Sequence, residues 1–305
     1  MNIFITGASG YIGSVLVKSL SKQFSIVAGS QKKIVPLLEN KNIKYKTVNY
    51  RSLKSLKKNL ENIDVVIHLV GMNKVECEKK KSKSLIFKKK ITLNIVKACK
   101  HHNIKKIIYL SSSQVYKDFQ TKFINEKSKL NKKSFYSLSH LLAEKIIIDE
   151  NVASYTIIRA SNIFGLITNR KCEKLKENLI HLLLDNAIQY NNISLKEPSI
   201  TKNFLPISVF VSNIKTIIKS NKYDKKTMNL GFKSMSLYGL ALIIKKRIKI
   251  LKNKKIKILI ERKLDNKNSN HKYTSLVKRF VYSKKKFIVE LDNIINLLTK
   301  KTFRK

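Results

Sequence analysis

A glycine-rich turn near the start of the chain has the composition of a phosphate-binding site. The apolar run Asn2–Thr6 leads directly into residues 7–13, GASGYIG, and then into an apolar helical stretch. In such a turn Gly7 permits the sharp change from strand to helix, Gly10 lets the backbone approach a pyrophosphate, and Gly13 permits close packing of the helix. The free N–H groups and the positive end of the helix would hold the pyrophosphate. The predicted cofactor contacts in this turn are Gly7, Gly10, Tyr11, Ile12 and Gly13.

The end of the second predicted strand bears on the choice of cofactor. A carboxylate at this point accepts hydrogen bonds from the ribose 2′-OH, whereas a basic group accommodates a 2′-phosphate. Here the chain reads AGSQKK over residues 28–33, without an acid. We therefore add Ser30 and Lys32 to the predicted cofactor contacts. The absence of an acid leans toward NADP, but lysine is common throughout the chain, so both NAD and NADP stay open.

Three further polar residues are spaced so that they face a ligand together. Ser112 follows the apolar strand Lys106–Leu110, at the end where ligands bind in parallel sheets. Tyr136 opens an amphipathic helix further along the chain, and His140 lies four positions later. Residues four apart share one face of a helix. Tyr136 and His140 are therefore predicted to point the same way.

The elements that must position these residues alternate between short apolar strands and longer amphipathic helices. This alternation is typical of βαβ units and a parallel sheet. The predicted strands are Asn2–Thr6, Ser25–Ala28, Ile43–Val48, Asp64–Leu69, Lys106–Leu110 and Thr156–Arg159, and the helices are Tyr11–Lys22, Leu53–Asn62, Ser84–His102 and Ser137–Asp149. The fold class is α/β, a Rossmann-like doubly wound parallel sheet with a smaller C-terminal substrate lobe.

The domain organisation follows from a change of rhythm after Gly165. Residues 1–165 form the predicted dinucleotide-binding domain, and residues 166–305 the substrate-binding lobe. In that lobe we expect a helix over Glu173–Tyr190 and strands at Ile193–Leu195 and Asn203–Ile207. Within residues 253–270 we expect an edge strand at Ile256–Ile260 followed by a polar loop. Another strand and helix, Thr227–Leu230 and Leu237–Lys246, are predicted to return to the main sheet. The two parts therefore interleave near residues 203–232.

With these motifs in place, the chain resembles the extended short-chain dehydrogenase/reductase family, in particular its NAD(P)-dependent nucleotide-sugar epimerases, dehydratases and reductases. The resemblance covers nearly the whole length. It is carried by TGASGYIG over residues 6–13, DVVIHL over 64–69, LSSSQVY over 110–116, FYSLSH over 135–140, RASNIFG over 159–165, NF over 203–204 and NLG over 229–231.

The resemblance implies hydride transfer between a sugar carbon and a nicotinamide, with a tyrosine moving the hydroxyl proton. Tyr136 matches that tyrosine and Ser112 the hydroxyl that orients it. Free tyrosine titrates near ~10, so it needs a neighbouring positive charge to act as a base at neutral pH. By position, Asn162 resembles a substrate contact, and Lys202 stands where the family has an arginine that holds the nucleotide phosphate. We therefore predict Ser112, Tyr136 and His140 as catalytic residues and Asn162 and Lys202 as substrate-binding residues.

Two positions depart from the family pattern. The family has a lysine four residues after the tyrosine, whereas this chain has His140, whose imidazole has an ordinary pKa near ~6.5. Lys145 lies too far around the helix to replace it. The family's asparagine in the helix before the catalytic strand falls near Lys88. Because residues 69–73, LVGMN, together with Tyr136–His140 resemble a subset of the family with histidine here, we expect a working enzyme; the alternative is a catalytically reduced relative that binds cofactor and regulates.

The composition of the 305 residues limits the other possibilities. The 64 Lys and Arg against 19 Asp and Glu give a net charge of +45, but the lysines are spread over every segment among Ile and Asn, as codon drift would produce. Nucleic acid is therefore expected to bind only nonspecifically. We expect no membrane span, no metal site and a cytoplasmic location. The resemblance adds a nucleotide-sugar substrate and a homodimer formed by the helices at Ser84–His102 and Ser137–Asp149.

Overall fold

The main sheet of the computed structural model is seven-stranded and entirely parallel. The model describes residues 1–32, 40–117, 123–166, 178–261, 271–277 and 285–302. In spatial order the strands are β11 (Lys226–Leu230), β7 (Tyr155–Ala160), β5 (Lys106–Ser112), β4 (Val65–His68), β1 (Asn2–Ile5), β2 (Ser25–Ser30) and β3 (Ile43–Thr47). This confirms the predicted fold class.

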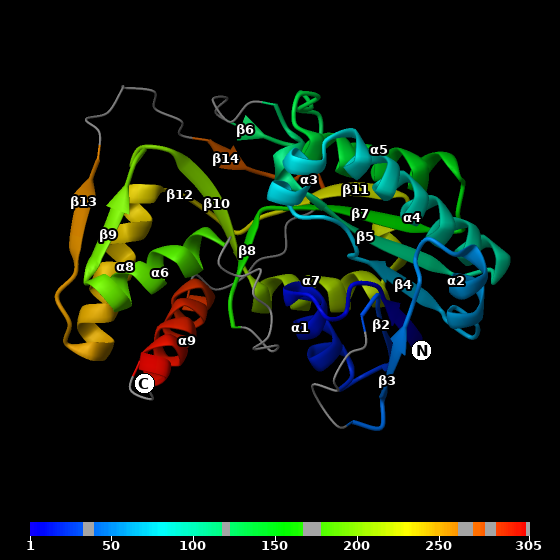
Figure 1. Cartoon of the computed structure of the whole chain (residues 1–305), viewed down its shortest axis with the longest axis horizontal. Helices are drawn as coiled ribbons and strands as arrows, with labels where there is room; N and C mark the ends of the chain where they lie inside the picture. Colours follow the sequence, from blue (N-terminus) through cyan, green and yellow to red (C-terminus); the bar gives the residue numbers. More distant parts are fainter. Residues whose placement is uncertain (33–39, 118–122, 167–177, 262–270, 278–284, 303–305) are drawn as a thin grey trace.

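Helices cover both faces of this sheet (Figure 1). One face packs against α1 (Tyr11–Leu20) and α7 (Ile207–Lys219), and the other against α2 (Leu53–Asn59), α4 (Ser82–His101) and α5 (Phe135–Asp149). The strands are buried on both sides, which explains their continuous apolar runs. Because parallel strands end at a common edge, the turns after β1, β4 and β5 lie side by side there.

A second lobe lies beyond the carboxyl ends of the strands (Figure 1). It contains a three-stranded sheet, a two-stranded sheet and three helices. These elements are β8 (Asn162–Phe164), β10 (Thr201–Pro206), β12 (Lys233–Ser236), β9 (Asn192–Leu195), β13 (Lys257–Ile260), α6 (Leu179–Tyr190), α8 (Leu237–Lys252) and α9 (Lys285–Thr302). The three helices and these sheets share an apolar core that includes Phe164, Phe204 and Phe287.

The chain crosses between the two parts more than once. It leaves the main sheet after β7, forms β8, α6, β9 and β10 in the second lobe, and returns through α7 and β11. Lys226 of β11 pairs with Thr156 of β7, so the strand expected at Thr227–Leu230 joins the main sheet at its edge. Helix α8 then packs in the second lobe, where the sequence had placed it with the main sheet.

Several elements differ from the sequence expectation, most of them short. Helix α3 (Lys74–Lys80) and a short β6–β14 pair (Phe123–Ile124 with Lys272–Tyr273) were not predicted, nor were β8, β12 and α9. The helix expected over Glu173–Tyr190 begins at Leu179, with Asn178 as its N-cap, and residues 173–177 lie outside the described part. The edge strand expected within 253–270 is Lys257–Ile260, with residues 262–270 outside that part.

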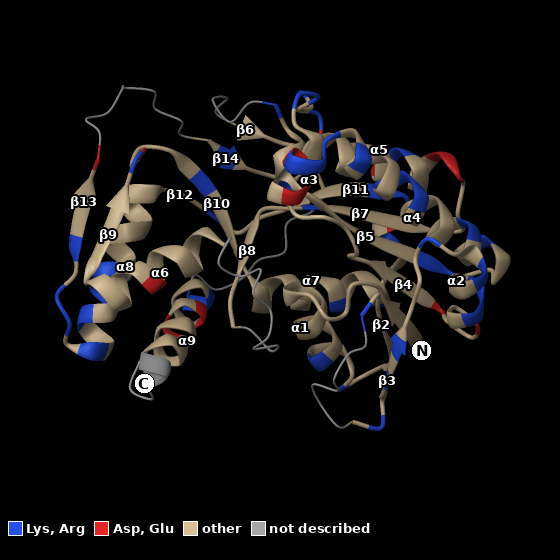
Figure 2. Cartoon of the chain, in the orientation of Figure 1, with Lys and Arg blue, Asp and Glu red and all other residues tan. Residues whose placement is uncertain are grey.

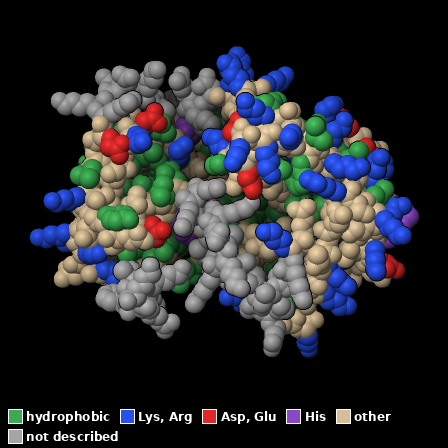
Figure 3. Space-filling view, in the orientation of Figure 1, with side chains coloured by type: hydrophobic (Ala, Val, Ile, Leu, Met, Phe, Trp, Pro, Cys, Tyr) green, Lys and Arg blue, Asp and Glu red, His purple; other side chains and the backbone are tan. Residues whose placement is uncertain are grey.

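The basic residues are dispersed over the molecule. Figure 2 shows Lys and Arg on the helices and strands of both lobes, and Figure 3 shows them scattered over the visible face. This distribution agrees with the dispersed pattern read from the sequence. Among the described helices, none is long and apolar enough to cross a membrane.

Candidate functional site

A cavity of about 570 Å³ opens at the carboxyl edge of the main sheet, and we call it the pocket. Its walls come from the glycine turn, the segments after β4 and β5, the helices α3, α4 and α5, and the second lobe. The predicted residues among its lining are Tyr11, Ile12, Ser112, Tyr136, His140, Asn162 and Lys202. The fold therefore brings together residues that are far apart in the chain.

The glycine turn has the geometry expected of a tight strand-to-helix connection. Gly7 has a φ of +66°, and a Cβ at Gly13 would lie 2.3 Å from the Gly7 carbonyl oxygen. Both positions therefore require glycine for the turn itself. A Cβ at Gly10 would meet only the Gly7 carbonyl oxygen, at 3.2 Å, so the rest of its surroundings are open. Helix α1 begins at Tyr11 with Gly10 as its N-cap and no side chain capping its amides, which suits a bound pyrophosphate.

The end of β2 lies directly against this turn. The Ser30 hydroxyl is 2.9 Å from that of Ser9, and it accepts a hydrogen bond from the Lys32 amide. Ser30 is buried, whereas Lys32 is exposed. Both lie beside the turn and outside the lining of the pocket, where the far half of a dinucleotide bound across the turn would lie.

Ser112 and Tyr136 meet at the centre of the pocket. Ser112 ends β5, and Tyr136 stands in the first turn of α5, which Ser134 caps by accepting from the Ser137 amide. The Ser112 side chain lies close enough to the Tyr136 hydroxyl to influence its pKa. Burial raises the pKa of Tyr136, and the Ser112 contact opposes that rise by favouring the anion. The two side chains therefore line the same pocket, and their catalytic roles stay a prediction.

His140 lies beside this pair, and its imidazole has a pKa lower than that of a free histidine. Its ring is edge-on to that of Tyr136, with centroids 4.7 Å apart, and its Nδ1 lies 2.7 Å from the Tyr109 hydroxyl. Burial and the charge of Lys88 hold the pKa of His140 well below its usual value. The imidazole is therefore neutral at pH 7, so it does not carry the positive charge of the missing lysine. Lys145 is exposed and pairs with Asp149.

Asn162 and Lys202 line the side of the pocket that belongs to the second lobe. The Asn162 amide donates to the Asn203 carbonyl oxygen at 2.8 Å, so it also ties β8 to β10. Burial, and then the charge of Lys74, lower the pKa of Lys202. Two lysines therefore lie near this wall, as an anionic group would require.

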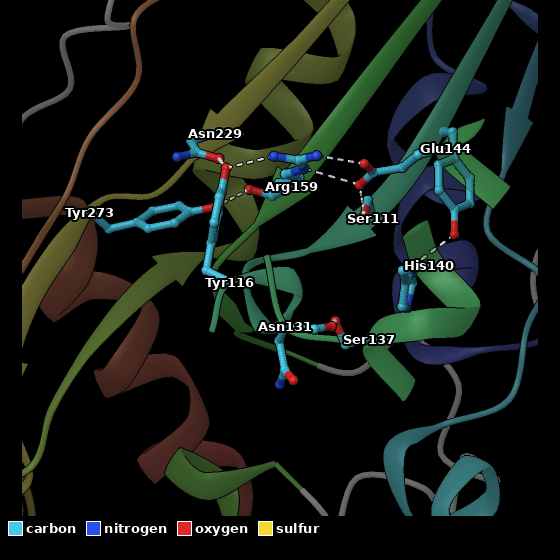
Figure 4. Close-up of polar contacts among 10 residues, drawn as sticks. Ser111, Tyr116, Asn131, Ser137, His140, Glu144, Arg159, Asn229 and Tyr273 are labelled. Carbon is cyan, nitrogen blue, oxygen red and sulfur yellow. Dashed lines mark hydrogen bonds and ion pairs between the residues drawn. The ribbon is translucent and has the colours of Figure 1, made fainter. Parts of the chain in front are cut away.

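Behind the pocket, a buried polar network connects α5 to the sheet (Figure 4). Glu144 of α5 forms a two-pronged ion pair with Arg159 of β7, at 3.1 Å and 2.7 Å, and accepts from the Ser111 hydroxyl. Arg159 also donates to the Tyr116 hydroxyl. The network fixes the helix carrying Tyr136 against the strand end carrying Ser112. Arg159, which lies beside Asn162 in the chain, belongs to this support and does not line the pocket.

The sequence interpretation missed part of the pocket wall. Lys88 of α4 is 4% exposed and lines the pocket, as do Cys77 of α3 and Ser139 of α5. Position 88 was noticed only as a departure from the family pattern. Its burial depends on how α4 packs against α5 and β4, which no local spacing reveals. His68 is fully buried between Thr6 and Thr92, as expected for a core residue.

The fold and the pocket define a Rossmann-type dinucleotide-binding protein with a tyrosine–serine pair at its centre. More narrowly, the chain belongs to the NAD dependent epimerase/dehydratase family, whose model matches residues 3–199. Membership confirms the resemblance inferred from the motifs and the family's nicotinamide cofactor.

Individual relatives agree with this assignment. The chain is 30% identical over 257 residues to a dTDP-D-glucose 4,6-dehydratase of Dictyostelium discoideum, covering 75% of this chain and 58% of that relative. Its fold is similar to that of a UDP-N-acetylglucosamine 4-epimerase from Methanobrevibacter ruminantium M1, with a TM-score of 0.81, 22% identity and 98% of each chain covered. It is also similar to a UDP-glucuronic acid 4-epimerase from Bacillus cereus, with a TM-score of 0.79, 19% identity, and 97% and 100% covered.

The residues present fit the family's cofactor. The side of Gly10 away from the Gly7 carbonyl is open, and the first turn of α1 has no side-chain cap. Tyr11 and Ile12 of this turn line the same pocket as Ser112 and Tyr136, so one extended ligand can reach from the turn to the hydroxyl pair. The turn would hold the pyrophosphate, and Ser30 and Lys32 would lie near the adenosine ribose.

Proposed function

We propose that this protein is a nucleotide-sugar epimerase that works with a bound nicotinamide cofactor. The observation that carries the proposal is that Tyr136 and Ser112 line one pocket together with Tyr11 and Ile12 of the glycine turn. A sugar hydroxyl placed against this pair would lie beside the end of the dinucleotide that accepts a hydride. The family's chemistry and this geometry therefore agree that the sugar carbon bearing this hydroxyl is the one that is oxidised.

In this proposal each residue has a limited task. Tyr136 takes the proton from the sugar hydroxyl as the carbon is oxidised and gives it back as the carbon is reduced. The Ser112 hydroxyl orients the Tyr136 oxygen and the sugar oxygen toward each other. When bound, the cofactor supplies a reversible hydride acceptor. Asn162 and Lys202 would hold the sugar and its phosphates, because they line the opposite wall.

The groups lining the pocket favour epimerisation over dehydration. Among the described lining residues, the titratable ones are Tyr11, Tyr136, His140, Cys77 and two lysines, and no described carboxyl group lines the pocket. Epimerisation needs one proton carrier at the oxidised carbon. Dehydration needs in addition a base for a neighbouring C–H and an acid for the departing hydroxyl. Tyr136 can serve as the one proton carrier that epimerisation needs.

The test is incubation of the purified protein in D₂O with a panel of uridine, thymidine, guanosine and cytidine diphosphate sugars, once with NAD and once with NADH. Nuclear magnetic resonance would follow the product. An epimerase returns the same hydrogen to carbon, so we expect an inverted sugar without deuterium at the reacting carbon. A dehydratase would produce a deoxyketo sugar with solvent deuterium, and a reductase would consume reduced cofactor in proportion to product. Either result would contradict the epimerase proposal.

A cofactor-binding relative without turnover is the second candidate, because the family's lysine is absent at position 140. Cofactor binding with no change in any sugar of the panel would favour it. The predicted homodimer, cytoplasmic location and nonspecific attraction to nucleic acid are separate proposals. Analytical ultracentrifugation checks the first and imaging of a tagged chain the second. A salt titration checks the third, since polyanion binding falls steeply with salt.

A further inference from the structure

Lys88 is a buried lysine that points into the pocket without a carboxylate partner. Its Nζ donates to the Val70 carbonyl oxygen at 3.0 Å and lies 3.1 Å from the position that a Cβ on Gly71 would take. It also stands 4.9 Å from the centroid of the Tyr109 ring. No described Asp or Glu pairs with it. A buried amine without a counter-ion is costly, and such groups cluster at functional sites.

The groups facing Lys88 come from every element packed around it. They are Cys77 of α3, His68 of β4, Tyr109 of β5 and His140 of α5. The Lys88 charge helps to keep His68 and His140 neutral. Burial lowers the pKa of Lys88 to about 7, and only Cys77 opposes this. The side chain is therefore half charged near pH 7 in the protein without ligand, and it would become fully charged if an anion bound nearby.

The position of Lys88 links it to Tyr136. His140 donates to or accepts from Tyr109 through Nδ1, and it packs edge-on against Tyr136. Lys88 lies over the Tyr109 ring, so a chain of contacts through Tyr109 and His140 connects Lys88 to Tyr136. The loop after β4 that Lys88 contacts also borders the glycine turn, since a Cβ on Gly7 would lie 3.3 Å from the Val70 Cα. Lys88 therefore lines the pocket beside the loop that borders the glycine turn.

We propose that Lys88, from α4, supplies the positive charge that other family members place four residues after the tyrosine. It contacts the bound cofactor, whose diphosphate makes it anionic, and cofactor binding completes its protonation. Lys88 is thereby a binding residue for the cofactor and a positioning residue for Tyr136, whose anion it favours through His140 and Tyr109. This inference rests on the proposed function only for the second role.

The first experiment measures cofactor binding without any sugar. Isothermal calorimetry with NADH near pH 8, in two buffers of different ionisation enthalpy, counts the protons taken up. If cofactor binding raises the pKa of Lys88 by a unit or more, wild type should take up about half a proton or more per site. Lys88→Met retains the length of the side chain and fills the buried space. It should bind NADH about tenfold more weakly and take up no proton.

Lys89 provides the matched control, since it is the next residue of the same helix and is exposed. Lys89→Met should behave as wild type in both affinity and proton uptake. The double variant Lys88→Met/His140→Lys returns a lysine to α5, and it should recover most of the roughly tenfold loss of affinity. Thermal unfolding of each variant confirms that the chain is folded.

The second experiment uses turnover, where a substrate has been found. The rate constant kcat of Lys88→Met should fall by about 10²-fold, within the range of lost acid–base assistance, and its ascending pH limb should move to higher pH. A purely structural role would leave that limb in place. Wild-type affinity, proton uptake and pH profile in Lys88→Met would overturn the inference. Proton uptake by wild type with no turnover of any sugar would instead refute the proposed function and leave the cofactor contact standing.

Discussion

Lys88→Met is expected to make the protein more stable near pH 7, and by an amount that shrinks as the pH rises. Lys88 is almost entirely buried, and its pKa is lowered from 10.5 to about 7. The unfolded chain therefore holds a proton on this amine at pH values where the folded chain has lost it. Because stability rises with pH wherever the unfolded state binds more protons, Lys88 destabilises the fold below pH 10.5 and the effect is complete below about pH 7.

The magnitude follows from the two pKa values. Each unit of pKa difference corresponds to about 1.4 kcal/mol, so Lys88 destabilises the native state by about 4 kcal/mol near pH 7. Near pH 10 most unfolded chains have also lost the proton, and the cost falls to about 1 kcal/mol. Methionine has no charge to desolvate and fills the same space. The difference in unfolding free energy between Lys88→Met and wild type should therefore decrease by about 3 kcal/mol between these two pH values.

The assay is urea denaturation of wild type, Lys88→Met and the exposed control Lys89→Met at both pH values. Other lysines also lose charge over this range, but they do so in all three proteins and cancel in the differences. Lys89→Met should follow wild type within about 0.5 kcal/mol at each pH. If the advantage of Lys88→Met were equal at pH 7 and pH 10, Lys88 would be charged in the folded protein throughout. The reasoning about its burial would then be refuted.

Three other changes test the rest of the site. Tyr136→Phe removes one hydroxyl and little volume, so kcat should fall by about 10²–10⁴-fold while NADH affinity, measured by fluorescence titration, stays near wild type. Gly10→Val places a branched side chain where the pyrophosphate would lie, and we expect loss of NADH binding with an unchanged circular dichroism spectrum; unchanged affinity would contradict the role of the turn. Glu144→Ala leaves Arg159 buried without its partner, which should lower the unfolding free energy by about 3–5 kcal/mol in urea denaturation.

The main sheet could be predicted from the sequence because its strands and helices are defined locally. Strands such as Val65–His68 are buried on both faces and show as apolar runs, and the glycine turn marks the join between β1 and α1. The second lobe was harder. Strand β8 has three residues and β12 has four, and both exist only through pairing with β10. Such short segments carry little pattern of their own, so their assignment depends on contacts between distant parts of the chain.

The candidate site divides in the same way. Ser112 and Tyr136 could be paired from the sequence because each follows a recognisable element at a common edge of the sheet. The charge state of His140 could not be predicted from the sequence, because it depends on burial and on Lys88, which lies on another helix. The network that supports the site was also hidden, since the residues Glu144, Arg159 and Tyr116 come from three separate elements.

The two departures from the family pattern, His140 and Lys88, are better explained together than separately. Taken singly, His140 is a lost lysine and Lys88 is a lost asparagine, and each suggests a weakened enzyme. In the structure Lys88 lies against Tyr109, whose hydroxyl His140 contacts, so the two positions share one partner. A second lysine at 140 would place two buried positive charges in the same small volume, at considerable cost. A neutral histidine avoids that repulsion and keeps a hydrogen bond to Tyr109. The pattern is therefore that of one positive charge moved from α5 to α4, which is the reason to expect the double variant Lys88→Met/His140→Lys to recover what the single variant loses.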